Sequence, residues 1–224
     1  NGGYGSARIL DKLDYDYIAS HPKLVVGFSD VTALQTALWE KCRLVTANGP
    51  LMVTLGGSDT YTAGQFFQGL TTAAWQGPLA LPAGRKLTTV VPGQAEGPIV
   101  GGNLTVLTSL VGTPYALDGT GCILVLEDTG EDAYRIDRML NQLWQSGLLS
   151  RVAAIAYGDF TDCPNDPDDF TTDQVLDYYA HLAGKPAIKG LPVGHTKDKA
   201  FVPYGVKVRL DADGEGASLT FIDG

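Results

Sequence analysis

The strongest constraint on the fold is an alternation of short apolar runs with segments of helical periodicity. The run at 24–28 (LVVGF) precedes a helical pattern over 30–42, and the run at 122–126 (CILVL) precedes an amphipathic pattern over 133–146. Apolar runs of this length, rich in β-branched residues, indicate strands that are buried on both faces, as in a parallel sheet covered by helices. The alternation therefore predicts an α/β protein.

Weaker patterns extend this alternation along the chain. Strands are expected at 44–48, 86–91, 98–100 and 152–157, helices at 60–70, 103–111 and 171–183, and a terminal hairpin at 206–210 and 218–222. Asn103 is the expected N-cap of its helix, and Thr171 or Thr172 caps the last one. The hairpin turns around Asp213-Gly214, a pair that suits tight turns.

Prolines and glycines punctuate residues 76–96, which are predicted to form a linker between two domains. Residues 1–75 are expected to form an incomplete, Rossmann-like α/β domain that lacks its first elements. Residues 97–224 are expected to form a second α/β domain with a mixed sheet. The chain begins inside a glycine-rich turn, and turns connect elements on both sides. We therefore expect it to be the C-terminal portion of a larger protein.

Charge and cysteine content exclude several functions. The formal net charge is −9 and no run of Lys or Arg occurs, so nucleic acid and anionic membrane surfaces are poor partners. Cys42, Cys122 and Cys163 are far apart and lie in no CxxC or Cys/His pattern. A disulfide framework and a zinc site are therefore not expected, and a reducing compartment fits this cysteine usage best. No metal site is predicted.

Ser29 lies at the predicted turn between strand 24–28 and helix 30–42. On such a turn a hydroxyl projects at the edge of the sheet, beside the free N–H groups of the helix start. The backbone N–H of Asp30 would then stabilise an oxyanion formed when the serine attacks a carbonyl. Serine is also a leading N-cap residue, and Val31 departs from the GxSxG pattern. A plain capping role is therefore an alternative.

Glu127 ends the apolar run 122–126. Ligands of α/β proteins gather at the carboxyl ends of strands, where a carboxylate is well placed to orient a histidine. The alternative is a carboxylate that simply meets water at the end of its strand.

Among the three histidines, His195 is the best candidate for a catalytic base. His21 lies in a turn, and His181 lies on a predicted helix as a surface or packing residue. His195 follows Gly194, which permits a close approach, and its neutral imidazole could take the proton of Ser29. A hydrogen-bonded structural histidine is the alternative.

The order Ser29, Glu127, His195 places nucleophile, acid and base as in one of the recurring catalytic triads. The three together are more specific than any one of them. If Ser29 only caps its helix, the chain is instead a non-enzymatic α/β binding module.

Several segments resemble, in the same order, the LD-carboxypeptidases, a serine peptidase family that includes the microcin C self-immunity proteins. The matching segments are 1–6 (NGGYGS), 27–34 (GFSDVTAL), 48–50 (NGP), 101–104 (GGNL), 110–115 (LVGTPY), 126–128 (LED) and 194–195 (GH). The chain departs from the family at Asn48, where a histidine is usual, and at Asn1, where a basic residue is common. Family members also carry further elements before the first segment.

The resemblance implies a catalytic triad of serine, histidine and glutamate at the three positions above. It implies an oxyanion hole formed by the backbone N–H groups of Asp30 and of Gly2 or Gly3. Gly102 and Asn103, in the GGNL segment, are assigned to substrate binding. The site should lie between the two domains, because the serine belongs to the first and its partners belong to the second.

By the same resemblance, the protein is expected to be a cytoplasmic, homodimeric serine carboxypeptidase of peptidoglycan recycling. It would cleave a terminal D-alanine from murein tetrapeptides through an acyl-enzyme, without metal or organic cofactor. A rival is a microcin C self-immunity peptidase, which cleaves aminoacyl-nucleotide analogues. Trp75 is the candidate platform for a nucleobase or another substrate group.

Overall fold

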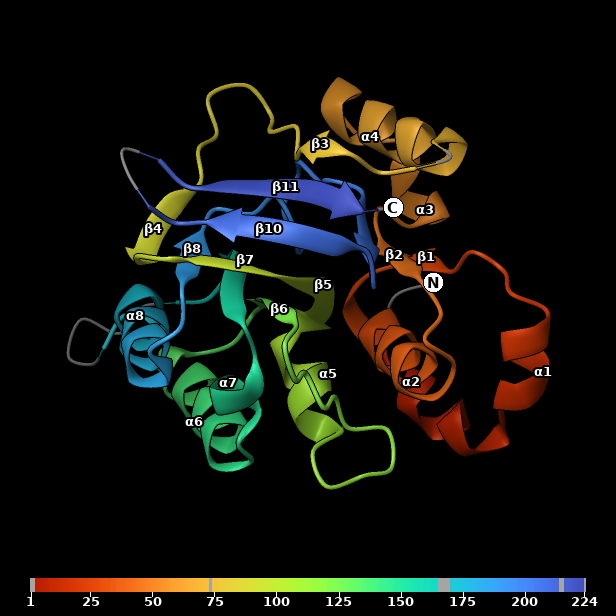
Figure 1. Ribbon diagram of the computed structural model, residues 1–224, viewed down its shortest axis with the longest axis horizontal. Coiled ribbons are helices and arrows are strands. Elements are labelled where there is room, and N and C mark those ends of the chain that lie inside the picture. The colour runs from red at the N-terminus through yellow and green to blue at the C-terminus, as the bar shows by residue number, and fades with distance from the viewer. Residues whose placement is uncertain (1–2, 73, 165–169, 214–215, 224) are drawn as a thin grey trace.

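The computed structural model describes residues 3–72, 74–164, 170–213 and 216–223, which form two sheets surrounded by helices (Figure 1). The helices are α1 (Tyr15–Ser20), α2 (Thr32–Cys42), α3 (Met52–Leu55), α4 (Thr60–Thr71), α5 (Leu104–Ser109), α6 (Ala133–Gln145), α7 (Leu148–Arg151) and α8 (Thr172–Ala183), with 3-10 segments η1 (Ser6–Lys12) and η2 (Ser29–Val31). The strands are β1 (Val26–Gly27), β2 (Thr46–Asn48), β3 (Gly77–Pro78), β4 (Thr88–Val91), β5 (Gln94–Asn103), β6 (Ile123–Thr129), β7 (Ala154–Thr161), β8 (Ala187–Lys189), β9 (Val202–Tyr204), β10 (Lys207–Asp211) and β11 (Ser218–Asp223).

The larger sheet has the strand order β3-β11-β10-β5-β6-β7-β8-β4. Its centre, from β5 to β8, is parallel, whereas β4, β10, β11 and β3 pair antiparallel at the two sides. Helices connect the parallel strands, as a parallel crossover requires. The prediction of an α/β fold with a mixed sheet is therefore confirmed.

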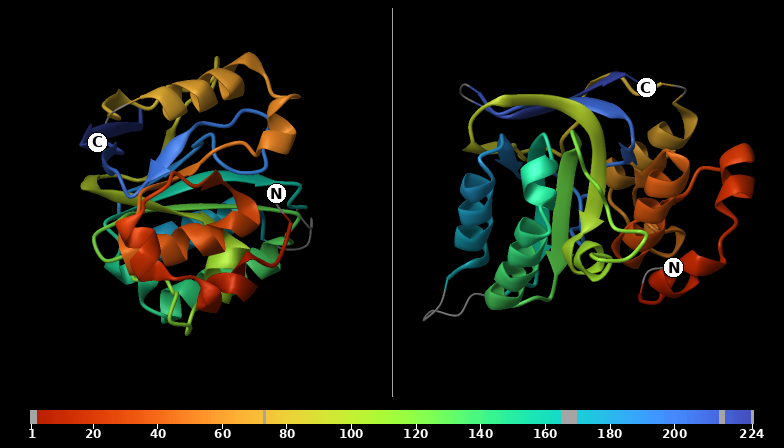
Figure 2. Two further views of the ribbon diagram at one scale, coloured as in Figure 1. Left: turned by 90° about the vertical axis from the view of Figure 1, so that its right-hand side faces the viewer. Right: turned by 60° about the horizontal axis from the view of Figure 1, so that its bottom comes forward.

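Both faces of the parallel strands are buried, which explains the uninterrupted apolar run on β6. Leu124 and Leu126 pack in a cluster with α5, α6, α7 and α8, while Ile123 and Val125 pack in a second cluster with the β10–β11 hairpin. In Figure 2 the helices and the hairpin lie on opposite sides of these strands. Side chains alternate along a strand, so both sets of alternate residues on β6 must be apolar.

The smaller sheet joins distant parts of the chain. β1 pairs parallel with β2, and β2 pairs antiparallel with β9, where Asn48 is opposite Val202. The segment between β8 and β9 is thereby brought to the turn that follows β1. The division into 1–75, 76–96 and 97–224 stays a prediction. β9, which belongs to the predicted second domain, completes the sheet that β1 and β2 of the predicted first domain begin.

The expected elements are present with shifted ends. Asn103 caps α5 through a hydrogen bond from the N–H of Val106, and Thr171 caps α8 in a capping box with Gln174. The terminal hairpin pairs as expected, although Gly214 of its turn lies outside the described residues. None of the helices in the described ranges is long and apolar enough to span a membrane.

The sequence patterns missed η1, α1, α3, α7, β3, β8 and β9. The three strands have two or three residues each. A run this short has no resolvable period, and its pairing depends on partners far away in the chain.

Helix α4 packs so closely on Phe201 that only glycine fits at position 69. A Cβ there would lie 2.3 Å from the Phe201 ring, whereas a Cβ at Gly64 of the same helix would meet nothing. We expect Gly69→Ala to lower the free energy of unfolding by about 1–3 kcal/mol through overpacking. Gly64→Ala should raise it by about 0.5–1 kcal/mol, because alanine favours the helix. Urea unfolding measures both, and equal stability of the two variants would contradict the packing.

Candidate active site

Ser29 occupies a strained turn between β1 and α2. Its backbone φ is 62°, a left-handed conformation that costs a non-glycine residue about 1–2 kcal/mol. The turn is tight, because a Cβ on Gly27 would come within 3.0 Å of the Val31 side chain. Such strain persists only where the surrounding structure enforces it, and it is often found at functional sites.

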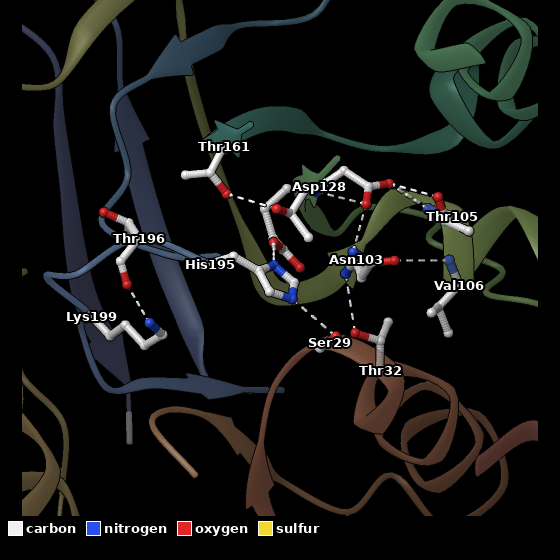
Figure 3. A network of polar contacts seen from close by, with 12 residues as sticks. Ser29, Thr32, Asn103, Thr105, Val106, Asp128, Thr161, His195, Thr196 and Lys199 are labelled. Carbon is white, nitrogen blue, oxygen red and sulfur yellow. Dashed lines mark hydrogen bonds and ion pairs between the residues drawn. The ribbon is translucent and has the colours of Figure 1, made fainter. Parts of the chain in front are cut away.

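The side chain of His195 lies between Ser29 and Glu127, and Figure 3 shows its bond to Ser29. Its Nε2 is 3.0 Å from the Ser29 Oγ, and its Nδ1 is 3.0 Å from the Glu127 Oε2. An ionised carboxylate can only accept a hydrogen bond. Nδ1 then carries the ring proton and Nε2 is left to accept the proton of the serine hydroxyl. The structure thus brings the three predicted residues together in one hydrogen-bonded line.

Glu127 is completely buried near the end of β6. It continues the alternation of Ile123 and Val125, so its side chain points away from the helices. Burial raises the pKa of Glu127, and the hydrogen bond with His195 opposes that rise. Because the carboxylate is shielded from solvent, its hydrogen bond with His195 meets little competition and fixes the orientation of the imidazole. A solvated strand end is therefore not the role of this residue.

Gly194 provides the space that the carboxylate and the histidine require. Its φ is 127°, and a Cβ at this position would lie 2.9 Å from the Glu127 Oε2 and 3.1 Å from the carbonyl oxygen of Asp159. Any side chain here would push the carboxylate away from the ring. The close approach that the sequence predicts for Gly194 is therefore an approach to Glu127.

Asp30 ties the opening turn of the chain to the serine. Its carboxylate accepts hydrogen bonds from the N–H groups of Gly5 and Ser6, at 3.2 and 2.9 Å, and from the Ser6 hydroxyl at 2.7 Å. Its own N–H belongs to the first turn of a helix, where amides lack helical partners. Gly3 is part of the tethered segment, with a φ of 120°. Gly2, the other predicted oxyanion residue, lies outside the described residues.

Gly102 and Asn103 contact the protein itself. A Cβ on Gly102 would lie 2.5 Å from the Thr32 Oγ1, and the N–H of Asn103 donates to that oxygen at 3.1 Å. The amide nitrogen of Asn103 donates to Asp128 at 2.9 Å, and its oxygen caps α5. Substrate binding by these two residues stays a prediction.

Asp128 is buried and fully bonded, a role that the sequence patterns missed. It accepts hydrogen bonds from Asn103, from the N–H and hydroxyl of Thr105, and from the N–H of Thr129. It points to the opposite face from Glu127, because the two are neighbours on one strand. Asp128 therefore holds the ends of β5 and β6 together beneath the site.

Trp75 packs beside Phe201. Their rings are stacked with centroids 6.3 Å apart, and both line a pocket of about 110 Å³ together with Gly69 and Leu79. The role of Trp75 as a substrate platform stays a prediction.

Arg85, in the predicted linker, holds the segment that leads to His195. Its guanidinium donates to the carbonyl oxygens of Gly190 and Leu191 at 2.7 and 3.0 Å and pairs with Asp159 at 2.6 Å. Nothing in the local pattern around Arg85 indicates this role, because all its partners are far away in the chain.

The arrangement as a whole suits nucleophilic catalysis. A hydroxyl bonded to an imidazole, which is in turn bonded to a buried carboxylate, is the constellation that activates a serine. The backbone N–H of Asp30 in η2 directly follows Ser29, and its role in an oxyanion hole stays a prediction. Among the described residues there is no group of three or more His, Cys, Asp or Glu side chains that could hold a metal ion.

Known proteins match most of this chain. Residues 96–210 match the LD-carboxypeptidase C-terminal domain, and residues 1–49 match the LD-carboxypeptidase N-terminal domain. A probable murein peptide carboxypeptidase of Bacillus subtilis is 39% identical over 218 residues, which cover 94% of this chain and 66% of that relative. The chain thus spans about two thirds of the relative's length.

Two solved structures share the fold. The crystal structure of a muramoyltetrapeptide carboxypeptidase from Oxalobacter formigenes has a TM-score of 0.85 and 32% identity, covering 100% of this chain and 77% of the other. That of an MccF-like protein from Bacillus anthracis has a TM-score of 0.85 and 28% identity, covering 100% and 74%.

The contacts of Arg85 predict that it positions His195, whereas its exposed neighbour Lys86 should not. Arg85→Met should slow the labelling of Ser29 by a fluorophosphonate about 10-fold or more, because small displacements of a catalytic base are costly. Lys86→Met removes the same charge from an exposed neighbour and should label at the wild-type rate. Labelling kinetics followed by mass spectrometry test this. Equal rates for both variants would show that Arg85 does not position His195.

Proposed function

The chain belongs to the LD-carboxypeptidase family, and from this premise we propose that it releases the terminal D-alanine of murein tetrapeptides by serine catalysis. The bond cleaved joins an L-centre to the D-residue. Relatives and structural neighbours named as murein peptide and muramoyltetrapeptide carboxypeptidases support a peptidase of this substrate class. The observation that carries the mechanism is the hydrogen-bonded line from Ser29 through His195 to Glu127.

In the first step Ser29 Oγ attacks the carbonyl carbon of the scissile bond while His195 Nε2 takes the hydroxyl proton. The carbonyl oxygen becomes an oxyanion, which the N–H groups of Asp30 and Gly3 stabilise. Glu127 stabilises the imidazolium that forms and keeps the ring oriented. The tether between Asp30 and the opening turn supports this assignment, because it fixes the two proposed donors relative to each other.

In the second step the tetrahedral intermediate collapses. The bond to the leaving nitrogen breaks, and His195 delivers its proton to the D-alanine amine. Water then attacks the acyl-enzyme, with His195 as the base, and releases the tripeptide and the free Ser29 hydroxyl. Protons and electron pairs balance within this cycle, and each residue returns to its starting state.

A cytoplasmic location, a homodimer and a site between two domains rest on the family resemblance. Cleavage of an aminoacyl-nucleotide analogue is the competing reaction. The likeness to the microcin C7 self-immunity protein MccF, which has been solved in complex with aspartyl sulfamoyl adenosine, supports it. Both reactions use the same nucleophile, so the substrate separates them.

Replacement of the nucleophile tests the reaction class. Ser29→Ala should lower the cleavage of an L,D-tetrapeptide by at least about 10³-fold, because loss of a triad nucleophile leaves only binding and oxyanion stabilisation. Ser20→Ala, at an exposed serine on α1, should keep full activity. The assay weighs the products of the tetrapeptide and of an aminoacyl sulfamoyl adenosine in parallel. Activity of Ser29→Ala within tenfold of wild type would refute the mechanism, and cleavage of the nucleotide conjugate alone would favour the competing reaction.

Replacement of the buried carboxylate should separate activity from stability. Glu127→Gln offers an amide that stabilises the wrong tautomer of His195, so activity should fall by about 10³- to 10⁴-fold. Burial raises the folded-state pKa of Glu127, so the unfolded chain loses this proton first as the pH rises. The wild type therefore loses stability as the pH climbs from the unfolded value, about 4.3, towards the folded pKa.

The glutamine variant has no such proton to lose. Its melting temperature should exceed that of the wild type at pH 7, and the difference should shrink at pH 4. Calorimetry at the two pH values measures this, and a glutamine variant that is less stable than the wild type at pH 7 would contradict the raised pKa.

A further inference from the structure

Lys199 brings a positive charge beside the proposed triad. It follows His195 on the same segment, and its half-buried ammonium donates a hydrogen bond to the carbonyl oxygen of Thr196 (Figure 3). The ammonium also lies 5.1 Å from the centre of the Phe28 ring, and this ring meets the His195 ring edge-on at 5.0 Å. Phe28 immediately precedes Ser29. The Lys199 ammonium and the His195 ring therefore both contact the ring of Phe28.

In the described part of the chain, no carboxylate lies within ion-pair distance of Lys199. Acidic side chains act on Lys199 from further away. Glu127 pairs with His195, Asp159 pairs with Arg85, and Asp59 accepts a hydrogen bond from the N–H of Thr62, while Asp198 interacts with Asp59. The cation is thus left without a contacting counter-charge.

A half-buried ammonium in this state favours an anion. It has three donors, of which Thr196 uses one. Burial lowers the pKa of Lys199, and the surrounding carboxylates act in the opposite direction. An anion that reached the two remaining donors would replace lost hydration with charge-assisted hydrogen bonds, which are about twice as strong as neutral ones.

The proposed reaction places an anion on this side of the site. His195 must deliver a proton to the leaving amine, so the leaving residue lies against the His195 ring. In a C-terminal residue the carboxylate carbon is two bonds from the amine nitrogen. Arg85 is occupied by Asp159 and by two carbonyl oxygens, which leaves Lys199 as the cation beside His195 with free donors.

We propose that Lys199 binds the free α-carboxylate of the leaving residue, a role that rests on the proposed function and makes the enzyme selective for C-terminal residues. A peptide whose last residue lacks that charge would leave the ammonium half-buried and unpaired. Such a peptide is cleaved less well for two reasons. It loses the attraction between its carboxylate and the ammonium, and it leaves the ammonium desolvated without a partner.

The test compares two substrates that differ only in the charge of the last residue. One is an L,D-tetrapeptide with a free terminal carboxylate, and the other is the same peptide with that carboxylate amidated. Other carboxylates of the peptide stay unchanged, so binding of those groups does not affect the comparison. The wild type should cleave the free acid with a kcat/KM about 10- to 100-fold above that of the amide, the range expected for a charge-assisted contact.

Lys199→Met should lower kcat/KM for the free acid to about the value for the amide and leave the amide unchanged. Lys199→Arg keeps the charge and should retain part of the preference. Lys197→Met, which removes an exposed lysine from the same segment, is the matched control and should behave as the wild type. If Lys199→Met does not fold, Lys199→Gln serves the same comparison.

The outcomes distinguish this role from the proposed function. Equal cleavage of acid and amide by the wild type, or an equal loss on both substrates in Lys199→Met, would overturn the assignment of Lys199 while leaving the peptidase reaction standing. A wild type that is labelled at Ser29 by a fluorophosphonate but cleaves neither peptide would instead refute the proposed function, and the assignment of Lys199 with it.

Discussion

The antiparallel pairing of β9 with β2 is the interaction on which the site depends. Ser29 and His195 are 166 positions apart in the chain, and the three-residue pairing of Thr46–Asn48 with Val202–Tyr204 brings their segments together. Three residue pairs give little stability by themselves. Packing reinforces the pairing. Phe201, just before β9, fits so closely against α4 that only glycine is tolerated at position 69 of that helix. Loss of that packing would therefore disturb the hydrogen bond between serine and histidine before it unfolded the larger sheet.

The burial of Glu127 is the main electrostatic cost of this arrangement. A carboxylate with no exposed surface loses its hydration, and the hydrogen bond with His195 compensates part of this loss. A solvated carboxylate would cost less free energy of desolvation, but water would compete for its hydrogen bonds and the imidazole could rotate. Full burial removes that competitor and ties the orientation of the ring to the strand. The neighbouring Asp128 shows the contrast, because its four hydrogen bonds make it a structural carboxylate on the other face of the same strand.

Local sequence patterns were sufficient for the α/β class, for most strands and for the caps of α5 and α8. They also offered Ser29, Glu127 and His195 as candidates, which the family resemblance then joined into one site. Ser29 and Glu127 were recognisable because each directly follows an apolar run, and strand ends are local features. Arg85 was not recognisable, because the surrounding glycines and prolines indicate only a linker and its partners lie about a hundred positions further on. β8 and β9 were missed for a similar reason, since their pairing is decided by distant strands. The catalytic roles themselves come from chemistry and family resemblance, and they remain proposals.

The segment that carries His195 is held on both sides by residues from the middle of the chain. Arg85 binds the carbonyl oxygens of Gly190 and Leu191 before the histidine. After it, the buried hydroxyl of Thr62 donates to the Lys197 carbonyl at 3.2 Å and accepts the Lys199 N–H at 2.9 Å. A general base must keep its position through two proton transfers in opposite directions, so a segment fixed at only one end would add mobility at the reacting atom. Thr62 of α4 and Arg85 thus hold the segment of the histidine from both ends, so both residues must keep their positions while the protons are transferred.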